Sequence, residues 1–332
     1  MAFLLFFKDI NKESVAEAGG KGASLGEMTN ASISVPPGFV VLASAFDRFI
    51  EESRLKEEIT ARLASVNPND MASVERASRM LRDVIQSTPM PEDLTKEIVT
   101  AYTQLDAEYV AVRSSATAED SSSASWAGEL ETYLNTTHEN LIERVRQCWS
   151  SLFTPRAIFY RHEKGLIDAH VSVAVVVQTM VQSEISGIAF TVHPVTEDRN
   201  QMIIEAAYGL GEAIVGGLVT PDSYVVNKKE MSLIDVSIGE QTRKLTRAKL
   251  KDQVPAIQNQ ATNMSEEASG SNEWINLGSE GSKQKLTGQQ IITLAALCKK
   301  IEDHYGFPCD IEWAYANNQF YITQSRPITT LK

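Results

Sequence analysis

The sequence predicts an α+β fold of two subdomains, because a mixed, largely helical first half gives way to a strand-rich second half. Between Ala45 and about residue 105, apolar residues recur every three or four positions, which is the spacing of amphipathic helices. After residue 170, apolar segments of strand length follow one another and are separated by turns. This change places one subdomain over residues 1–170 and the other over residues 171–332.

The elements of the first subdomain can be assigned in chain order. A short apolar run predicts a strand, a glycine turn leads into a helix that runs to about residue 30, and Phe39 to Leu42 predicts a second strand. Proline-containing breaks then divide the helical stretch, and a strand, a serine-rich mobile loop and an interrupted helix follow. The segments are Phe3–Phe7, Gly19–Gly22, the breaks Asn67-Pro68 and Pro89–Pro91, Tyr109–Arg113, residues 119–128, and Leu141–Tyr160 with its interruption at Thr154-Pro155.

The second subdomain begins with a β-rich run, Val171–Val181, which is expected to turn at Ser183–Gly187 and pair with Ile188–Val192. More strands and a short helix between glycines follow, and the polar stretch 258–285 is expected to be flexible. A helix with Thr287 as its candidate N-cap precedes two closing strands. These later segments are Met202–Ala207, Gly209–Gly217, Ser223–Asn227, Leu233–Ile238, Thr287–His304, Cys309–Ala314 and Gln319–Gln324.

Composition and charge exclude several classes of protein. The 332 residues carry 31 Lys and Arg against 43 Asp and Glu, a net charge of −12, which argues against general binding of nucleic acid or an anionic membrane. The cysteines Cys148, Cys298 and Cys309 form no CxxC pair, which argues against a zinc site or a disulfide framework. The N-terminal apolar run is too short for a signal peptide or a membrane span. We therefore expect a globular protein of a reducing cytoplasm.

The turn Gly19-Gly20-Lys21-Gly22 is a candidate phosphate-binding element. Glycines let the backbone approach a ligand closely, and Lys21 supplies a cation for phosphate oxygens. The turn is not a Walker A loop, because GxxxxGK[ST] is absent. A plain turn at the start of a helix is the alternative.

Arg113 ends an apolar strand in Val110-Ala-Val-Arg-Ser-Ser115, where a charge needs a partner. A guanidinium suits phosphate because its planar fork donates to two oxygens at once. The serine-rich loop that follows, as far as Gly128, is a candidate lid over a nucleotide. The alternatives are a structural ion pair for Arg113 and a solvated linker for the loop.

The closing pair of strands carries the most distinctive polar cluster. Glu312 lies between Ile311 and Trp313 on one strand, and Gln324 and Arg326 end the next. If the strands pair, a carboxylate, an amide and a guanidinium converge. Oxygen ligands suit Mg²⁺, whose other ligands are phosphates and water, and arginine can neutralise a transferred phosphoryl group. The alternative is a buried Glu–Arg salt bridge.

Two further features carry less weight. Gly209 and Gly211 precede a short helix whose N-terminus is a candidate anion site, although a lone GxG motif is more often structural. The five histidines share no spacing typical of a metal site. His193, in Phe190-Thr-Val-His-Pro194, is the most suggestive of them, and a structural or surface role is favoured.

Together these segments resemble the N-terminal ATP-binding domain shared by phosphoenolpyruvate synthase, pyruvate phosphate dikinase and rifampicin phosphotransferase. The matching stretches run in family order along the whole chain. They are Gly19-Gly-Lys-Gly-Ala-Ser-Leu-Gly26, Val35-Pro-Pro-Gly-Phe39, Ala111-Val-Arg-Ser-Ser-Ala-Thr-Ala-Glu-Asp120, Ala127-Gly through Thr132-Tyr-Leu134, Cys148-Trp-Ser-Ser-Leu-Phe153, Ser186-Gly-Ile-Ala-Phe-Thr191, Gly209-Leu-Gly-Glu212, Asp310-Ile-Glu-Trp313 and Gln324-Ser-Arg-Pro-Ile-Thr-Thr-Leu331.

The resemblance implies an ATP-grasp fold with the nucleotide in the cleft between the two subdomains. It implies that Lys21 and Arg113 contact the ATP phosphates, and that Gly128 and Thr132 lie in a lid turn over them. Arg326 would also contact the phosphates, which makes Arg326 and Arg113 the candidate catalytic residues.

The same resemblance implies the rest of the site. Gln178 would line the adenine pocket, and the backbone of Met180 and Val181 would serve the base. Glu312 and Gln324 would hold Mg²⁺. ATP and Mg²⁺ are therefore the expected cofactors.

In the reaction that the resemblance implies, ATP is split at two points. A histidine on a swivelling domain receives the β-phosphate, AMP and phosphate leave, and the phosphohistidine then phosphorylates a small-molecule acceptor. The phosphohistidine motif, a TxGG turn followed by His, and the acceptor-binding domain are absent from these residues. The chain is therefore expected to act as part of a larger phosphotransferase, binding ATP without completing the transfer alone.

The acceptor is expected to be a rifamycin antibiotic. Phe190-Thr-Val-His-Pro-Val-Thr196, the following Asn200-Gln-Met-Ile-Ile-Glu205, and the ending Ser325-Arg-Pro-Ile-Thr-Thr-Leu331 are closer to rifampicin phosphotransferases. Pyruvate, the substrate of phosphoenolpyruvate synthase, is the alternative. An alternative of another class is a non-catalytic nucleotide-binding module, against which the complete set of polar residues argues.

Overall fold

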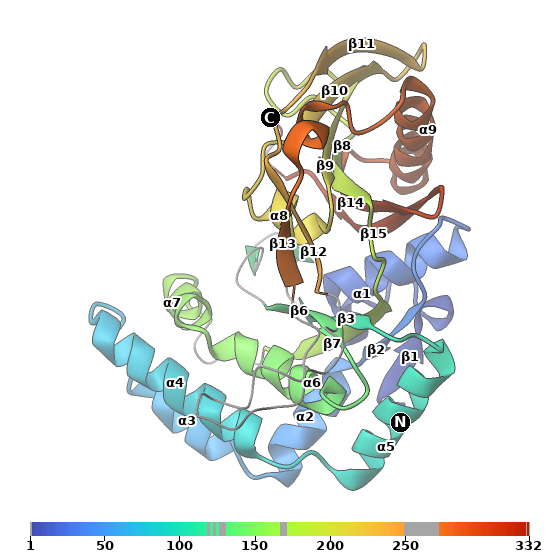
Figure 1. Cartoon of the computed structure of the whole chain (residues 1–332). Coiled ribbons are helices and arrows are strands. Elements are labelled where there is room, and N and C mark those ends of the chain that lie inside the picture. The colour runs from blue at the N-terminus through green and yellow to red at the C-terminus, as the bar shows by residue number, and fades with distance from the viewer. Residues whose placement is uncertain are drawn as a thin grey trace, which may run out of the picture. The chain divides into compact units, whose positions relative to one another are not determined.

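A computed structural model of the chain describes residues 2–117, 120–121, 124–125, 131–166, 171–248, 272–329 and 331. It divides into two compact units, unit 1 with Met1–Glu27 and Pro37–Met180, and unit 2 with Met28–Pro36 and Val181–Lys332. Each unit combines helices with an antiparallel sheet, so the predicted α+β class is confirmed (Figure 1). Within the described ranges, no helix has the length and apolar character needed to cross a membrane.

Unit 1 is built on a five-stranded sheet in the order β1-β2-β7-β3-β6, in which every neighbouring pair is antiparallel. The boundary predicted near residue 170 lies just before β7. Because β7 pairs with both β2 and β3, unit 1 extends to Met180. The strands are β1 (Leu4–Phe6), β2 (Gly38–Val41), β3 (Val110–Ala116), β6 (Thr132–Thr136) and β7 (Val173–Thr179), and two short strands, β4 (Asp120–Ser121) and β5 (Ala124–Ser125), pair with each other.

Helices of unit 1 are separated at the predicted breaks, whereas the division between α2 and α3 at residues 53–55 was not predicted. Asp70 caps α4 by accepting a hydrogen bond from the Ala72 N–H at 3.0 Å, and Thr154 caps α7, where Pro155 takes the first helical position. The helices are α1 (Val15–Asn30), α2 (Ala43–Glu52), α3 (Lys56–Ala64), α4 (Met71–Ser87), α5 (Glu92–Leu105), α6 (Leu141–Ser150) and α7 (Pro155–Glu163), with 3-10 turns η1 (Phe7–Asp9) and η2 (Ser151–Phe153).

The two faces of this sheet have different roles. Alternate strand residues such as Phe39, Val112 and Val175 are fully buried in a core that they share with residues of α2 and α4 to α6. The opposite face is contacted by α1, since a Cβ atom at Gly22 would lie 3.0 Å from Val40. Successive strand residues point to opposite faces, so a strand that is apolar on its core side can carry polar groups toward α1.

Unit 2 is built on a six-stranded antiparallel sheet in the order β11-β10-β9-β8-β14-β15. The predicted pairing of Val171–Val181 with Ile188–Val192 is wrong. Strand β8 begins at Ile185, inside the predicted turn, and pairs with β9 and β14, whereas β7 belongs to the sheet of unit 1. The strands are β8 (Ile185–Phe190), β9 (Gln201–Tyr208), β10 (Asp222–Asn227), β11 (Ser232–Ser237), β14 (Cys309–Ala316) and β15 (Gln319–Pro327).

Local signals define the remaining elements of unit 2, which are α8 (Gly211–Val215), α9 (Gly288–Tyr305) and η3 (Gly278–Ser282). Thr287 forms the predicted N-cap as part of a capping box with Gln290. The stretch 258–285 that was expected to be flexible contains β13 (Asn272–Asn276), which pairs with β12 (Arg243–Arg247), while residues 258–271 lie outside the described part. Pairing with β12 supplies the order that the polar composition did not predict.

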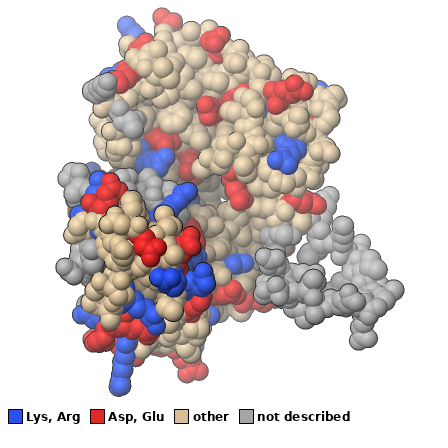
Figure 2. Space-filling model, turned by 90° about the vertical axis from the view of Figure 1, so that its left-hand side faces the viewer, with Lys and Arg blue, Asp and Glu red and all other residues tan. Residues whose placement is uncertain are grey.

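The surface seen in Figure 2 carries both signs of charge. Lys and Arg side chains lie among Asp and Glu side chains on this face rather than in one basic field. This mixture agrees with the excess of acidic residues in the sequence.

Candidate functional site

Strand alternation separates the polar candidates of unit 1 from its core. On β3, Val112 points into the core, so Arg113 points to the opposite face, and Ser115 shares that face. The register between β3 and β7 places Ala111 opposite Gln178, so the Gln178 side chain lies on the same side as Arg113. The Arg113 side chain therefore points away from the apolar core, so its charge does not need a partner there.

Arg113 and Thr132 lie directly opposite each other across the β3–β6 ladder. Arg113 is half-buried, and Thr132 is exposed. Opposed residues of an antiparallel pair have Cβ atoms about 4.5–5.5 Å apart, so the two side chains are neighbours. The structure thus brings together two of the residues predicted for the phosphate region.

The glycine turn is attached to the same strand. Gly19 interrupts α1 with φ 67° and ψ 171°, a conformation that essentially only glycine adopts. The Ser115 hydroxyl donates to the Ala18 carbonyl at 3.0 Å and accepts from the Gly22 N–H at 3.4 Å. Contact with β3 thus accounts for Gly19, and half-buried Lys21 lies within the clamped turn.

Gln178 has an unusual environment for an amide. Its side chain is 2% exposed, and its Nε2 has no hydrogen-bond partner among the described residues. Leaving a buried donor unpaired costs about 1–3 kcal/mol, and such exceptions in folded proteins call for an explanation. A polar ligand on this face of the sheet would provide one.

Met180 and Val181 follow Gln178 at the junction of the two units. The Met180 N–H donates to the Tyr109 carbonyl at 3.0 Å, and its Sδ accepts from the Asn135 N–H at 3.1 Å. The Val181 carbonyl accepts from the Ser183 N–H at 2.9 Å. These two backbone groups are already engaged, which restricts how the segment can contact a base. Gly128 lies outside the described residues, and its lid role stays a prediction.

In unit 2, the predicted cluster of Glu312, Gln324 and Arg326 required the two closing strands to pair, and they do. Strands β14 and β15 pair, and Glu312 lies directly opposite Gln324. The register then shifts, because Trp313 pairs with Ile322 and leaves Thr323 as the extra residue of a β-bulge. Gln324 is 8% exposed, and Glu312 is half-buried. A carboxylate and an amide therefore stand side by side on one face of the sheet.

Arg326 lies opposite Asp310 and forms an ion pair with it. Its Nε and its terminal nitrogen lie 2.9 and 2.8 Å from Asp310 Oδ2. The sequence alternative was a salt bridge between Glu312 and Arg326, and the ion pair with Asp310 was not predicted. Sequence reasoning gave Asp310 no role, although its spacing of two from Glu312 puts both carboxylates on one face.

Glu205 is a further polar residue on this face of the sheet, and the sequence did not predict it either. Ile188 on β8 lies opposite both Glu205 and Glu312, so Glu205, Glu312 and Gln324 share one face of the sheet. Burial raises the pKa of the Glu205 carboxyl above its ordinary value. Only the order of strands in the sheet brings Glu205 next to these residues, because no local sequence pattern predicts that β9 pairs with β8.

The two weaker candidates have structural partners. His193 Nδ1 accepts the Val195 and Thr196 N–H groups, both at 3.3 Å, which matches the favoured structural role. At Gly209, φ is 93° and an added Cβ would lie 2.3 Å from the Leu245 carbonyl oxygen, so β12 accounts for this glycine. Helix α8, which follows, has only five residues.

The candidate residues of unit 1 are two cations and the amide of Gln178. Those of unit 2 are two oxygen ligands and one arginine. Across the described ranges, no group of three or more His, Cys, Asp and Glu side chains is arranged to hold a metal ion. Glu312 and Gln324 supply two oxygen donors, which suits an ion such as Mg²⁺ that takes its remaining ligands from phosphates and water.

The chain is similar to several known proteins. A probable phosphoenolpyruvate synthase of Methanocaldococcus jannaschii is 44% identical over 100% of the chain and 27% of the relative. Another, of Archaeoglobus fulgidus, is 46% identical over 99% of the chain and 42% of the relative. Rifampicin phosphotransferase of Bacillus cereus is 38% identical over 99% of the chain and 36% of the relative.

The chain thus spans less than half the length of these curated relatives. Residues 15–332 match the family described as pyruvate phosphate dikinase, AMP/ATP-binding domain. Because that match covers nearly the whole chain, this protein belongs to the family of pyruvate phosphate dikinase AMP/ATP-binding domains.

Proposed function

We propose that the chain binds Mg·ATP and prepares it for phosphoryl transfer to a histidine that lies outside these residues. The observation that carries the proposal is the pairing of Glu312 with Gln324 on the face that also presents Arg326. In phosphoryl transfer the protein mainly positions the phosphates and neutralises the charge that develops on them. A carboxylate, an amide and a guanidinium in one place are suited to that work.

Glu312 and Gln324 would hold Mg²⁺ through their oxygen atoms. A metal ion held there would supply positive charge against the negative charge of the phosphates. Arg326, kept in position by Asp310, would place its guanidinium on the phosphates. Half-buried Glu312 and buried Gln324 are pre-ordered by their strands, which limits the entropy lost on binding.

In unit 1, Lys21 and Arg113 would contact ATP phosphates, with Thr132 beside Arg113. The clamp between Ser115 and the glycine turn supports this role, because it fixes the segment that carries Lys21 to the strand that carries Arg113. Two cations from separate segments would balance the negative charge that magnesium leaves on the triphosphate. Arg113 and Arg326 are the residues that we expect to stabilise the transition state.

The adenine would bind near Gln178, whose unpaired Nε2 can donate to a ring nitrogen. Since the Met180 N–H and the Val181 carbonyl are engaged elsewhere, we propose that the Met180 carbonyl and the Val181 N–H serve the base. We also propose that the domain has the ATP-grasp fold and that Gly128 belongs to a lid over the nucleotide.

The full reaction would need further domains. A histidine would take the β-phosphate of ATP, AMP and phosphate would leave, and the phosphohistidine would phosphorylate a small acceptor. For the acceptor, identities of 44% and 46% to the archaeal phosphoenolpyruvate synthases, against 38% to the rifampicin phosphotransferase, favour pyruvate over the rifamycin expected from local motifs.

Nucleotide binding is tested by isothermal titration of the chain with a non-hydrolysable ATP analogue and Mg²⁺. Each charged hydrogen bond contributes about 1.5–3 kcal/mol, so Arg113→Ala and Glu312→Gln should each weaken binding about 10- to 100-fold. Glu302→Gln, whose carboxylate pairs with Lys228, is the control and should bind normally. Equal binding by the Arg113→Ala, Glu312→Ala double variant would refute the proposal.

The transfer step is tested by adding a phosphohistidine domain from a relative and ATP radiolabelled at the β-phosphate. Label on the histidine domain supports a catalytic role, and no label in the presence of normal ATP binding supports a non-catalytic nucleotide module. Supplying pyruvate or a rifamycin together with the matching acceptor domain would then identify the acceptor.

A further inference from the structure

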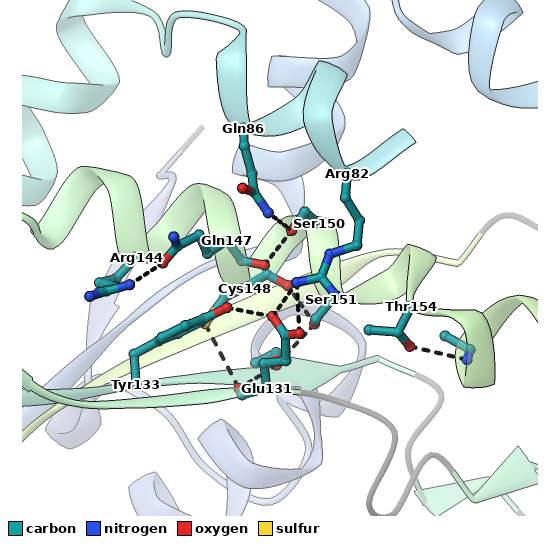
Figure 3. A network of polar contacts seen from close by, with 12 residues as sticks. Arg82, Gln86, Glu131, Tyr133, Arg144, Gln147, Cys148, Ser150, Ser151 and Thr154 are labelled. Carbon is teal, nitrogen blue, oxygen red and sulfur yellow. Dashed lines mark hydrogen bonds and ion pairs between the residues drawn. The ribbon is translucent and has the colours of Figure 1, made fainter. Parts of the chain in front are cut away.

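A polar network lies on the helix side of the unit 1 sheet and is centred on the Glu131 carboxylate (Figure 3). Arg82 of α4 donates to both carboxylate oxygens, at 2.7 and 2.9 Å, and the Tyr133 hydroxyl donates to one of them. The Arg144 guanidinium covers the Tyr133 ring at 5.0 Å from its centroid. The carboxylate is therefore fixed from two directions by groups on α4 and β6.

The Glu131 backbone is fixed as well. Its carbonyl accepts from the Ser114 N–H at 3.1 Å and from the Ser114 hydroxyl at 2.8 Å. Ser114 is in turn held by the Ser151 hydroxyl at 3.2 Å. The side-chain carboxylate and the backbone carbonyl of Glu131 are thus both held by hydrogen bonds, although the residue lies just before β6.

This anchor is one residue away from the candidate phosphate site. Glu131 precedes Thr132, Ser114 follows Arg113, and Arg113 lies opposite Thr132 in the ladder. Because alternate side chains point to opposite faces, Glu131 and Ser114 face the helices while Thr132 and Arg113 face the other way. A shift of Glu131 on the helix side must therefore move Thr132 on the ligand side.

We propose that Arg82 and Glu131 form a positioning pair that sets Thr132 and Arg113 for the ATP phosphates, an inference that rests on the proposed nucleotide-binding function. The Arg82 and Glu131 side chains are 25% and 29% exposed, so the pair is largely buried and holds Glu131 in a defined place. Its effect on geometry matters because a misplacement of about 1 Å can cost about 100-fold in the rate of a reaction.

Arg82 also lines a surface cavity of about 500 Å³, together with Ser78, Arg79 and Gln86 of α4 and Pro155 of α7. Truncating Arg82 opens a path from solvent to the Glu131 carboxylate. A small guanidinium compound can enter by this path and replace the lost group. Chemical rescue is therefore available as a test that a purely structural defect would not pass.

The experiment compares the affinities of the chain for Mg·ATP and for adenosine. Arg82→Ala should weaken Mg·ATP binding about 10- to 100-fold and leave adenosine binding unchanged, because only the phosphate contacts are displaced. Ethylguanidinium should restore much of the loss, and Arg82→Lys should restore part of it. Arg79→Ala is the matched control, one turn earlier in the same cavity, and should bind both ligands normally.

Glu131→Gln keeps the shape of the side chain and provides a second variant if Arg82→Ala does not fold. It should show the same selective loss for Mg·ATP. Normal Mg·ATP binding by both variants, equal loss of Mg·ATP and adenosine, or failure of ethylguanidinium to rescue a folded Arg82→Ala would overturn the positioning role. Failure of the unmodified chain to bind Mg·ATP would instead refute the proposed function.

Discussion

Gly19 packs against Ser115 so closely that a Cβ atom at residue 19 would lie 2.2 Å from the Ser115 Oγ and 2.4 Å from its carbonyl oxygen. The contact joins the turn that carries Lys21 to the strand that carries Arg113. The hydroxyl of Ser115 completes the joint by bonding to the backbone on both sides of the turn. The glycine is thus needed for assembly of the two segments as well as for its backbone conformation.

Gly19→Ala is expected to lower the free energy of unfolding by about 2–4 kcal/mol, because strained backbone and overpacking act together. Urea unfolding followed by circular dichroism measures this change. Gly288→Ala is the control, since a Cβ atom there meets nothing within 4 Å, and it should leave stability unchanged or slightly raised. Equal effects of the two substitutions would contradict the close contact.

Gln178→Leu should separate stability from binding. Removing a buried amide without a partner for its Nε2 should leave the unfolding free energy unchanged or raise it by about 1 kcal/mol, while Mg·ATP binding weakens about 10-fold. Thr179→Val is the matched control, because Thr179 Oγ1 also has no partner among the described residues and its side chain points to the other face. It should leave ATP affinity intact, and an equal loss in both variants would exclude a ligand role for Gln178.

Lys285 and Asp222 form a fully buried ion pair in unit 2, with Nζ 2.8 Å from Oδ1 and both side chains 0% exposed. Lys285 Nζ also donates to the Gly239 carbonyl at 2.5 Å. Lys285→Met should destabilise the chain by about 3–5 kcal/mol, because it leaves the Asp222 charge buried and unpaired. Lys283→Met, which breaks the exposed pair with Glu280, should not change the thermal melting temperature measurably.

Glu205 should make the stability of the chain depend on pH. Burial raises its pKa above the ordinary 4.5, so the folded state holds the proton more tightly than the unfolded state. Its contribution to stability is therefore present in full below pH 4.5 and is lost as pH rises through the folded pKa. The stability advantage of Glu205→Gln over the unmodified chain should increase between pH 4 and pH 7, as measured by urea unfolding. A constant difference across that range would show that Glu205 has no raised pKa.

Local patterns predicted most of the elements. The N-cap at Thr287, the break at Thr154-Pro155 and the strand predicted from Cys309 to Ala314 each depend on residues close in sequence, and the structure confirms all three. The hairpin expected after Val181 is wrong for the opposite reason. A strand's apolar residues fix which face is buried, but they do not choose its partner, and β7 pairs with β2 and β3.

The sequence by itself determined the family, the α+β class and the chemical groups available at Lys21, Arg113, Glu312, Gln324 and Arg326, because these follow from residue identity and short-range spacing. Only the tertiary structure decided that Asp310 pairs with Arg326, that Ser115 bonds to the glycine turn, that Glu205 shares a sheet face with Glu312, and that Arg82 pairs with Glu131. Those relationships join residues far apart in the chain, and strand order and register set them through pairing that no local pattern specifies.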